Sequence, residues 1–509
     1  MNALRHVAHV ARVATVVAVC SWVGWFGCGT KSDPTGFEIS GSSGGASGGV
    51  EEDGSLNLTP MGDGGSTSGG GGQQYTFTSD GGVVATGPCP GGGSTTISGK
   101  IYDPAAKDVL YGAVAYVPSK PVTALQLGAT CDSCNSLYTG SPIAAAQTDA
   151  TGSFTIQNAP SGTNIPLVIQ LGKWRKQLKI NTVTACKDNA QPDKSLTLPA
   201  NHMEGDIPNI AVSTGGADTL ECLLLRMGVD PAEYEPGAQG PGRIHIFAGG
   251  TMGTFFGLTI GASPNTSPPG PASSAALWNS DADIDDFDIV MLSCEGSETT
   301  NMDQQVLFDY AAKGGRVFAS HFHYAWFNSG PFAAAANLAT WTTGANPVGS
   351  GNINSVVEQT LLDGKTPFAK GVAMKEWLGT VGALGVNGAP AGELPIVQAK
   401  HNANLSTSNT VSTSWIVPDP STNATAGTTL YFSFNTPFGM GTENQCGRVV
   451  FSDLHIGGGS KDTGGTVPGE CATGDLSPQE KALEFMLFDL SACVVPDNAP
   501  PPALTIVPQ

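Results

Sequence analysis

Three short apolar segments in the C-terminal half of the chain each end in side chains that could do chemistry. These are Cys294-Glu295 after 287–293, His321 and His323 after 316–320, and Asp453 and His455 after 448–452. Thiol, imidazole and carboxylate groups act as nucleophiles, general bases and metal ligands. Because ligands of parallel sheets bind outside the carboxyl ends of the strands, we expect these groups to share one site.

A divalent metal site is one interpretation of this set. In an extended chain alternate residues share a face, so His321 and His323 would point the same way, as would Asp453 and His455. Two such pairs could supply three or four nitrogen and oxygen ligands. The alternative, which we prefer because a bare His-x-His spacing is common, is a pocket where these groups bind each other or a ligand.

A catalytic interpretation is also open. Cys294 could act as a nucleophile, with His321 or His455 as its base and Glu295 orienting that base. Ser320 beside a histidine is a further option, without an identifiable acid partner. Cysteines of exported proteins are usually oxidised, so we expect Cys294 in a disulfide instead, with Cys446 as its candidate partner.

Aromatic residues surround the same segment. Tyr324 and Trp326, together with Phe318, Phe322 and Phe327, could stack on a sugar or another flat ligand. Because alternate strand residues must pack, most of these rings are expected in the core. The predicted ligand-binding set is therefore His321, His323, Tyr324, Trp326, Asp453 and His455.

Strands and helices alternate along this half of the chain. The predicted strands are 243–247, 287–293, 316–320, 431–435 and 448–453. The predicted helices are 218–227, begun by Asp218, 303–313, begun by a capping box of Asn301 and Gln304, and 478–490, begun by one of Ser477 and Glu480. This alternation predicts an α/β, flavodoxin-like three-layer domain with a mostly parallel sheet.

The region 95–200 contains short strands with no helical period, which is typical of a small all-β sandwich. Its opening Gly99/Ile101/Asp103, its strand Gly112-Ala113-Val114 and its turn Thr148/Asp149/Gly152/Phe154 resemble the carboxypeptidase regulatory-like, prealbumin-type fold. That resemblance implies a non-catalytic spacer or adhesion module.

The C-terminal half resembles the class I glutamine amidotransferase-like superfamily, closest to its trehalose-utilisation (ThuA-like) branch. The resemblance rests on Gly314-Gly315-Arg316 before a strand that ends in His321, and on Gly447-Arg448-Val449-Val450-Phe451 leading to His455. True amidotransferases carry a cysteine in a Gly-x-Cys-x-Gly turn after that strand. This chain has Ala319-Ser320-His321-Phe322-His323 instead, so glutamine hydrolysis is expected to be absent.

The N-terminus resembles a bacterial lipoprotein signal. A charged start with Arg5 and Arg12 precedes an apolar run that ends before Cys28. That run is shorter than the roughly 20 residues a membrane span needs. We expect cleavage before Cys28 and lipidation of its thiol, with an ordinary secretory signal as the alternative. Gly29 follows, without the aspartate that retains some lipoproteins at the inner membrane, so the outer membrane or cell surface is preferred.

The cysteine count is informative. Of 11 cysteines, Cys20 would leave with the signal and Cys28 would be lipidated, so an odd number remains. Most should form disulfides in an exported protein, and at least one should be free or pair outside the chain. Cys131 and Cys134 could form a redox pair or half of a zinc site, but structural disulfides, with Cys186 as one possible partner, are preferred.

We divide the chain into six parts: signal peptide 1–27, Gly/Ser-rich disordered tether 28–94, β-sandwich 95–200, connecting segment with a helix 201–242, amidotransferase-like domain 243–495 and disordered tail 496–509. The net charge of −20 argues against nucleic-acid binding. The sequence predicts a cell-envelope lipoprotein that binds a ligand or partner, such as a carbohydrate, through a domain without glutaminase activity. The alternative is an envelope hydrolase that acts on a carbohydrate or related substrate, either with the help of a divalent metal or without it.

Overall fold

The structure is a computed structural model that describes residues 73–77, 83–132, 134, 136–249, 253–255, 258–260, 272–299, 301–349, 351–459, 471–502 and 504. The chain divides into two units, 1–54 and 55–509, and all described residues belong to the second. The expected signal peptide, the lipidation site Cys28 and most of the tether lie outside the described residues. Among the helices that the structure describes, none has the length and apolarity to cross a membrane.

Two four-stranded sheets form the region predicted as β-structure. One holds β3 (Thr96–Tyr102), β6 (Ser153–Ile156), β9 (Asp188–Ala190) and β10 (Leu196–Thr197); the other holds β4 (Val114–Pro118), β5 (Pro142–Gln147), β7 (Gly162–Leu171) and β8 (Trp174–Val183). β8 shows why: from Lys176 to Asn181 its residues alternate between partly buried and exposed, as in a strand with one face on a core.

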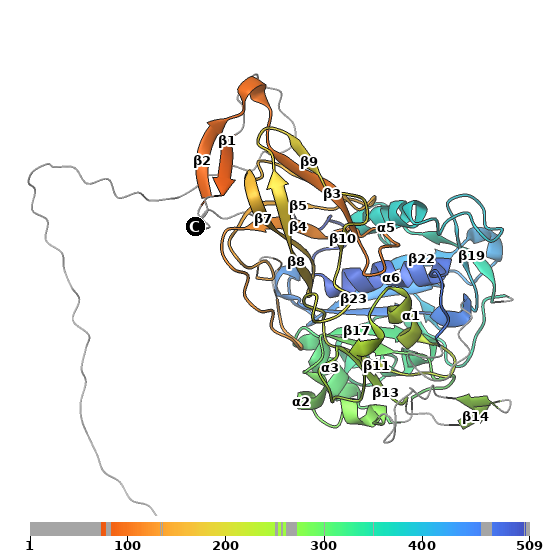
Figure 1. Ribbon diagram of the computed structural model, residues 1–509. Helices are drawn as coiled ribbons and strands as arrows, with labels where there is room; N and C mark the ends of the chain where they lie inside the picture. The colour runs from red at the N-terminus through yellow and green to blue at the C-terminus, as the bar shows by residue number, and fades with distance from the viewer. Residues whose placement is uncertain are drawn as a thin grey trace, which may run out of the picture. The chain divides into compact units, whose positions relative to one another are not determined.

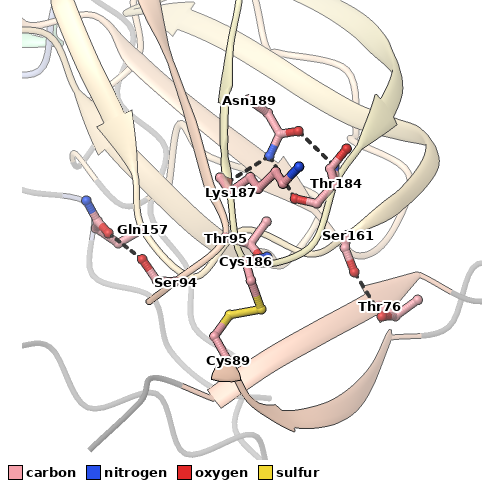
Figure 2. The surroundings of a disulfide bond; sticks show 10 residues. All are labelled: Thr76, Cys89, Ser94, Thr95, Gln157, Ser161, Thr184, Cys186, Lys187 and Asn189. Atoms are coloured by element: carbon pink, nitrogen blue, oxygen red, sulfur yellow. Dashed lines mark hydrogen bonds between the residues drawn. A yellow bond between two sulfur atoms is a disulfide. The ribbon is translucent and has the colours of Figure 1, made fainter. Parts of the chain in front are cut away.

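A short hairpin lies within the segment expected to be an unstructured tether. β1 (Gln73–Phe77) pairs antiparallel with β2 (Val83–Pro88). Figure 2 shows how it is held: the Thr76 and Ser161 hydroxyls lie 3.0 Å apart, and β2 runs into Cys89, which is disulfide-bonded to Cys186. The ordered region therefore begins before position 95.

The C-terminal half is built on one ten-stranded mixed sheet. In spatial order the strands are β12 (Tyr234–Pro236), β13 (Ile244–Phe247), β11 (Ile210–Ser213), β16 (Ile289–Leu292), β17 (Arg316–Ser320), β24 (Gly447–Ser452), β23 (Tyr431–Thr436), β22 (Ser412–Pro418), β19 (Ile353–Val357) and β20 (Leu394–Ile396). β12 to β24 are parallel, and the pairs from β24–β23 onward are antiparallel. The sequence predicted β13, β16, β17, β24 and β23. It missed β11 and β12 of the parallel part and the antiparallel extension by β22, β19 and β20.

Helices pack on both faces of this sheet (Figure 1). On one face lie α1 (Leu220–Arg226), α5 (Ala369–Thr380) and α6 (Pro478–Ser491), whose apolar side chains join strand residues such as Val212 and Val450 in one core cluster. On the other face α2 (Asp281–Ile284), α3 (Gln304–Ala312) and α4 (Gly330–Ala335) pack with Val290 and Phe451. Alternate residues of a strand face opposite sides, which explains the two clusters.

The helix starts agree only partly with the predictions. The capping box of Ser477 and Glu480 at α6 is confirmed. For α3 the predicted box of Asn301 and Gln304 is wrong, because the Asp303 carboxylate caps the helix instead. Asp218 does not cap α1, which begins after Thr219, and its carboxylate has another role described below.

Four disulfides are present among the described residues. They join Cys89 to Cys186, Cys131 to Cys446, Cys134 to Cys493, and Cys222 to Cys471. The structural interpretation of Cys131 and Cys134 is confirmed, while the suggested partner Cys186 is wrong for both. Cys294 is free and buried. The expected disulfide between Cys294 and Cys446 is therefore wrong. Disulfides of this number indicate an exported protein.

The start of the expected disordered tail is held by charge. The Asp497 side chain is 8% exposed, and its carboxylate accepts a hydrogen bond from Arg448 at 2.9 Å. The ammonium of Lys370 lies 3.4 Å from the same carboxylate and 2.7 Å from that of Asp489. The chain therefore remains packed past Pro496, because leaving Arg448 without its two carboxylates would bury an uncompensated cation.

Candidate functional site

The candidate site lies where β16, β17 and β24 end, at the carboxyl edge of the parallel strands. Cys294 follows β16 by two residues, His321 follows β17 directly, and His455 lies three residues after β24. The paired strands β16–β17 and β17–β24 are neighbours, so their ends meet. β11, which runs between β13 and β16, marks the point where the strand order reverses, and such points are where ligands bind in open sheets.

The backbone turns sharply at His321. Its φ is 42°, a left-handed conformation that costs a residue other than glycine about 1–3 kcal/mol. Immediately after β17 the chain enters the 3-10 helix η4 (His321–Trp326). The expectation that His321 and His323 share a strand face is therefore wrong, because the extended chain ends between them.

A continuous row of contacts joins four side chains. The Cys294 Sγ lies 3.4 Å from the His321 Nδ1, which lies 2.9 Å from the His455 Nε2. The His455 Nδ1 lies 2.6 Å from the Gln398 Oε1. Because an amide oxygen only accepts, His455 donates from Nδ1 and its Nε2 carries a lone pair toward His321. His321 then donates its Nδ1 proton to His455.

The thiol and both imidazoles are almost completely shielded from water. Cys294, His321 and His455 are 0%, 1% and 8% exposed. Burial raises the pKa of the Cys294 thiol to about 12, although hydrogen bonds from the backbones of Phe322 and Gly296 act in the opposite direction. Burial, with smaller contributions from the neighbouring His455 and Lys400, lowers the pKa of His321 to about 2. Burial and Lys400 likewise lower the pKa of His455 to about 3. In the absence of a bound cation all three groups are neutral at pH 7.

Asp218, which was not assigned to the site from the sequence, and Ser320, which was considered there only as a nucleophile, hold the backbone of the site in place. The buried Asp218 carboxylate accepts hydrogen bonds from the amides of Ile456 at 3.0 Å and Gly457 at 2.7 Å. It thereby fixes the chain immediately after His455. The Ser320 hydroxyl accepts from the Cys294 amide at 2.9 Å. Asp218 was interpreted from the sequence as a helix cap, which is the more common use of an aspartate at that position.

A loop from the antiparallel part of the sheet completes the surroundings. Gln398 is exposed and has a left-handed φ of 57°, while Lys400 is partly buried and its amide donates to the Asp453 carbonyl oxygen at 2.8 Å. Neither residue stands in a motif, so no sequence signal pointed to them. Together they place one amide and one ammonium group at the solvent side of the site.

The remaining predicted residues lie nearby but do not join the row. The His323 Nδ1 is 3.0 Å from the Ser320 carbonyl oxygen. The Asp453 carboxylate accepts from the amides of Asn402 at 2.5 Å and Ala403 at 2.8 Å. Burial raises the pKa of Asp453 to about 7. The predicted metal set of His321, His323, Asp453 and His455 is thus not brought together as a whole; the structure places Cys294 with the first and last of these.

The carboxylate and aromatic candidates are buried as well. Glu295 is fully buried, and the Thr299 hydroxyl donates to it at 3.1 Å. The Tyr324 hydroxyl donates to Glu298 and accepts from the Gly344 amide. Trp326 packs edge-on against Trp278 with ring centroids 4.8 Å apart. Tyr324 and Trp326 are both 0% exposed, so these rings act as core and do not present a stacking surface to solvent.

The arrangement allows two kinds of chemistry. A thiol beside an imidazole is the pair that nucleophilic enzymes use, but the His321 Nδ1 that faces the thiol already carries the proton donated to His455 and must lose it before it can accept one from sulfur. The same thiol and imidazole atoms converge closely enough to bind one cation. The high pKa of Cys294 works against the first use, because the thiolate is the nucleophile.

Comparisons with known proteins give little help with identity. No family model matches the chain, and no curated protein matches it. Solved structures that match include two mutant type II cohesin–X-dockerin complexes from Acetivibrio cellulolyticus. They are 19% and 18% identical, cover 25% and 27% of this chain and 78% and 85% of theirs, and give TM-scores of 0.15 in both cases. At that score the likeness supports no conclusion about fold or function.

Proposed function

We propose that this protein is an exported cell-envelope lipoprotein, anchored through Cys28, whose flavodoxin-like three-layer domain binds a ligand or partner and has no glutaminase activity. The observation that carries the proposal is His321 at the turn after β17, where the amidotransferase-like pattern would have its cysteine. The nearest thiol, Cys294, belongs to the neighbouring strand end and is buried with a pKa near 12.

The solvent side of the site is the place where a ligand would make contact. Gln398 is exposed and Lys400 partly so, whereas the imidazoles behind them are buried. An amide and an ammonium group suit a ligand rich in oxygen atoms, such as an envelope carbohydrate. An anchor at Cys28 would keep the domain near such ligands, at the outer membrane or the cell surface.

Two assays test the absence of glutaminase activity and the presence of binding. The full-length protein, incubated with glutamine, should release no ammonia above buffer. In a thermal-shift screen against envelope polysaccharide fragments, a ligand at about 100 times its Kd should add about 2.7 kcal/mol to the unfolding free energy. Lys400→Ala should weaken that shift. Lys313→Ala is the control and should leave the shift unchanged, because Lys313 pairs with Asp281 of α2 and with Asp285, the C-cap residue of that helix. Glutamine hydrolysis that disappears in Cys294→Ser would contradict the proposal.

Lipidation is tested separately. Mass spectrometry of the protein from its native membrane should find a diacylglyceryl group on Cys28, and Cys28→Ser should release the protein from the membrane fraction. A mature N-terminus that carries no lipid and lies at a position other than residue 28 would show that the segment is an ordinary secretory signal.

A hydrolase acting on a carbohydrate or related envelope substrate is the second candidate. The 3.4 Å contact between the Cys294 Sγ and the His321 Nδ1 favours it, because it places a potential nucleophile beside a potential base once that nitrogen has lost the proton it donates to His455. Turnover of an ester, amide or glycoside that is lost in His321→Ala and kept in His202→Ala would establish it. His202 is a matched control because it pairs with Glu233 elsewhere.

A further inference from the structure

We infer that Cys294, His321 and His455 form a buried binding site for one thiophilic d10 metal ion, Zn²⁺ or Cu⁺. The three ligand atoms are the Cys294 Sγ, one nitrogen of His321 and the Nε2 of His455, and all lie within 4.8 Å of one another. This site stands whether or not the domain binds an envelope ligand at its solvent side.

The spacing of the ligand atoms matches a metal coordination shell. The Sγ–Nδ1 distance from Cys294 to His321 is 3.4 Å, and the Nδ1–Nε2 distance from His321 to His455 is 2.9 Å. With Zn–N near 2.0–2.1 Å and Zn–S near 2.3 Å, the edges of a zinc tetrahedron are about 3.3–3.6 Å. Two of the three edges therefore lie within about 0.5 Å of the tetrahedral values. The third edge, from the Cys294 Sγ to the His455 Nε2, lies within 4.8 Å and has to close by up to about 1.2 Å, and the His321 Nδ1 has to give up the proton that it donates to His455.

The ligand types select the class of metal. One sulfur and two imidazole nitrogens suit zinc and copper, whereas calcium and magnesium require oxygen ligands. Three protein ligands leave a fourth position for water or a small molecule. The nearby Asp453 carboxylate does not change this selection: one of its oxygens accepts hydrogen bonds from the amides of Asn402 and Ala403, which hold it outside the Cys294, His321 and His455 cluster.

The surrounding groups orient the ligands as they do in known metal sites, where the second ring nitrogen of a ligating histidine donates to an oxygen. Gln398 accepts from the His455 Nδ1 and so directs the Nε2 lone pair inward. Asp218 anchors the amides that follow His455, and Ser320 anchors the Cys294 amide. The left-handed backbone of His321 brings its ring into contact with both other ligands.

The electrostatic surroundings tolerate a cation. Asp218 and Glu295 lie close enough to Cys294 to act on its charge, and a metal-bound Cys294 is itself an anion. They oppose the ammonium of Lys400, the one cation identified near the site among the described residues. Among the described cysteines Cys294 is also the only one outside a disulfide, and ligation would explain how a thiol survives in an oxidising compartment.

The test measures metal content directly. The full chain, purified through a tag without histidine, is loaded with Zn²⁺ or with Cu⁺ under reducing agent too weak to open disulfides, dialysed, and analysed by inductively coupled plasma mass spectrometry. We expect about one equivalent of one of these ions per chain. Cys294→Ser and His321→Ala should each retain less than about a tenth of it, and His202→Ala should retain all of it.

Two further measurements keep the inference testable if the buried variants fail to fold. Gln398→Ala changes an exposed residue and should weaken metal affinity about 10–100-fold, as loss of an orienting partner does. Co²⁺ substituted into the wild-type protein should show a sulfur-to-cobalt charge-transfer band, which only a cysteine ligand produces. Wild-type protein that binds neither ion stoichiometrically, or that binds Co²⁺ without this band, would overturn the site.

Discussion

His321 combines a strained backbone with contacts to two other buried side chains of the candidate site. It occupies the turn after β17 with a left-handed backbone, and its ring contacts a thiol on one side and a second imidazole on the other. Strain of this kind persists only when surrounding contacts compensate for it, and it is concentrated at functional sites. The strained turn therefore marks His321 as the centre of the candidate site.

The Cys294 thiol should be nearly inert in the folded protein. It is fully buried and its pKa is raised to about 12, so at neutral pH its thiolate fraction is about a thousandfold or more below that of a free cysteine. Iodoacetamide labelling followed by peptide mapping should modify Cys294 only after denaturation. Rapid labelling of the native protein would show that the thiol is accessible and activated.

Asp103 should make stability depend on pH. Burial, and to a smaller degree the charge of Asp108, raise its pKa from 3.8 to about 7, against hydrogen bonds from the amides of Lys107 and Asp108. Glu484 and Lys481 of α6 lie beside the same pair. A carboxyl whose pKa is raised by folding contributes stability that is fully present below 3.8 and is lost as the pH rises through about 7.

Asp103→Asn removes this loss and keeps the side-chain oxygen that accepts from the backbone. Relative to wild type, the variant should gain about 1–3 kcal/mol of unfolding free energy between about pH 4 and pH 8, measured by urea denaturation. Asp149→Asn, at an exposed turn, is the matched control. Equal pH profiles for wild type and Asp103→Asn would show that Asp103 ionises normally.

At the scale of elements, strand β24 and helix α6 are joined by buried charge. Arg448 of β24 lies 3.0 Å from the Asp489 carboxylate of α6 and donates to Asp497 at 2.9 Å. Its guanidinium also stacks over Trp415 at 5.7 Å from the ring centroid. This network fixes the helix, the sheet and the start of the C-terminal tail relative to one another.

Arg448→Met should destabilise the fold by about 3–5 kcal/mol, because it leaves two buried carboxylates sharing only Lys370. Lys313→Met is the comparison: it removes two ion pairs of similar length, but its side chain is 42% exposed, and exposed pairs contribute at most about 1 kcal/mol. Denaturation midpoints of the two variants measure the difference. Similar midpoints would indicate that the Arg448 network is replaceable by apolar packing.

At the scale of the whole molecule, disulfides connect the β-sheets to the mixed-sheet region. Cys131–Cys446 and Cys134–Cys493 link positions 315 and 359 residues apart, and a single apolar cluster includes residues of both regions, such as Ile97 and Leu483. The two regions were predicted as separate domains. Their shared core and crosslinks indicate that they unfold together.

The pair Cys131→Ala/Cys446→Ala should lower the unfolding free energy by about 2–4 kcal/mol, because it frees a long loop in the unfolded chain. Calorimetry of wild type should show one transition for the described region, and the double variant should move it to lower temperature. Two separate transitions in the wild type would contradict the shared core.

Much of this molecule is predictable from local sequence. The capping box at Ser477, the strands that end at His321 and near His455, and the absence of a cysteine at that turn all follow from residues close together in the chain. Local patterns work here because caps, apolar alternation and glycine turns act over a few residues. The odd cysteine count likewise predicted one thiol outside the disulfides.

The features that could not be predicted from the sequence depend on contacts between segments far apart in the chain. Which cysteine stays free, the reversal of the backbone at His321, the antiparallel strands β19, β20 and β22, and the placement of Gln398 beside His455 all depend on pairings across long separations. No local propensity encodes such pairings, because the free energy that selects them comes from burying side chains against partners far away in the chain. For that reason the sequence could place Cys294, His321, His323, Asp453 and His455 at one edge of a sheet, whereas only the folded structure decided that Cys294, His321 and His455 bring their ligand atoms within 4.8 Å of one another.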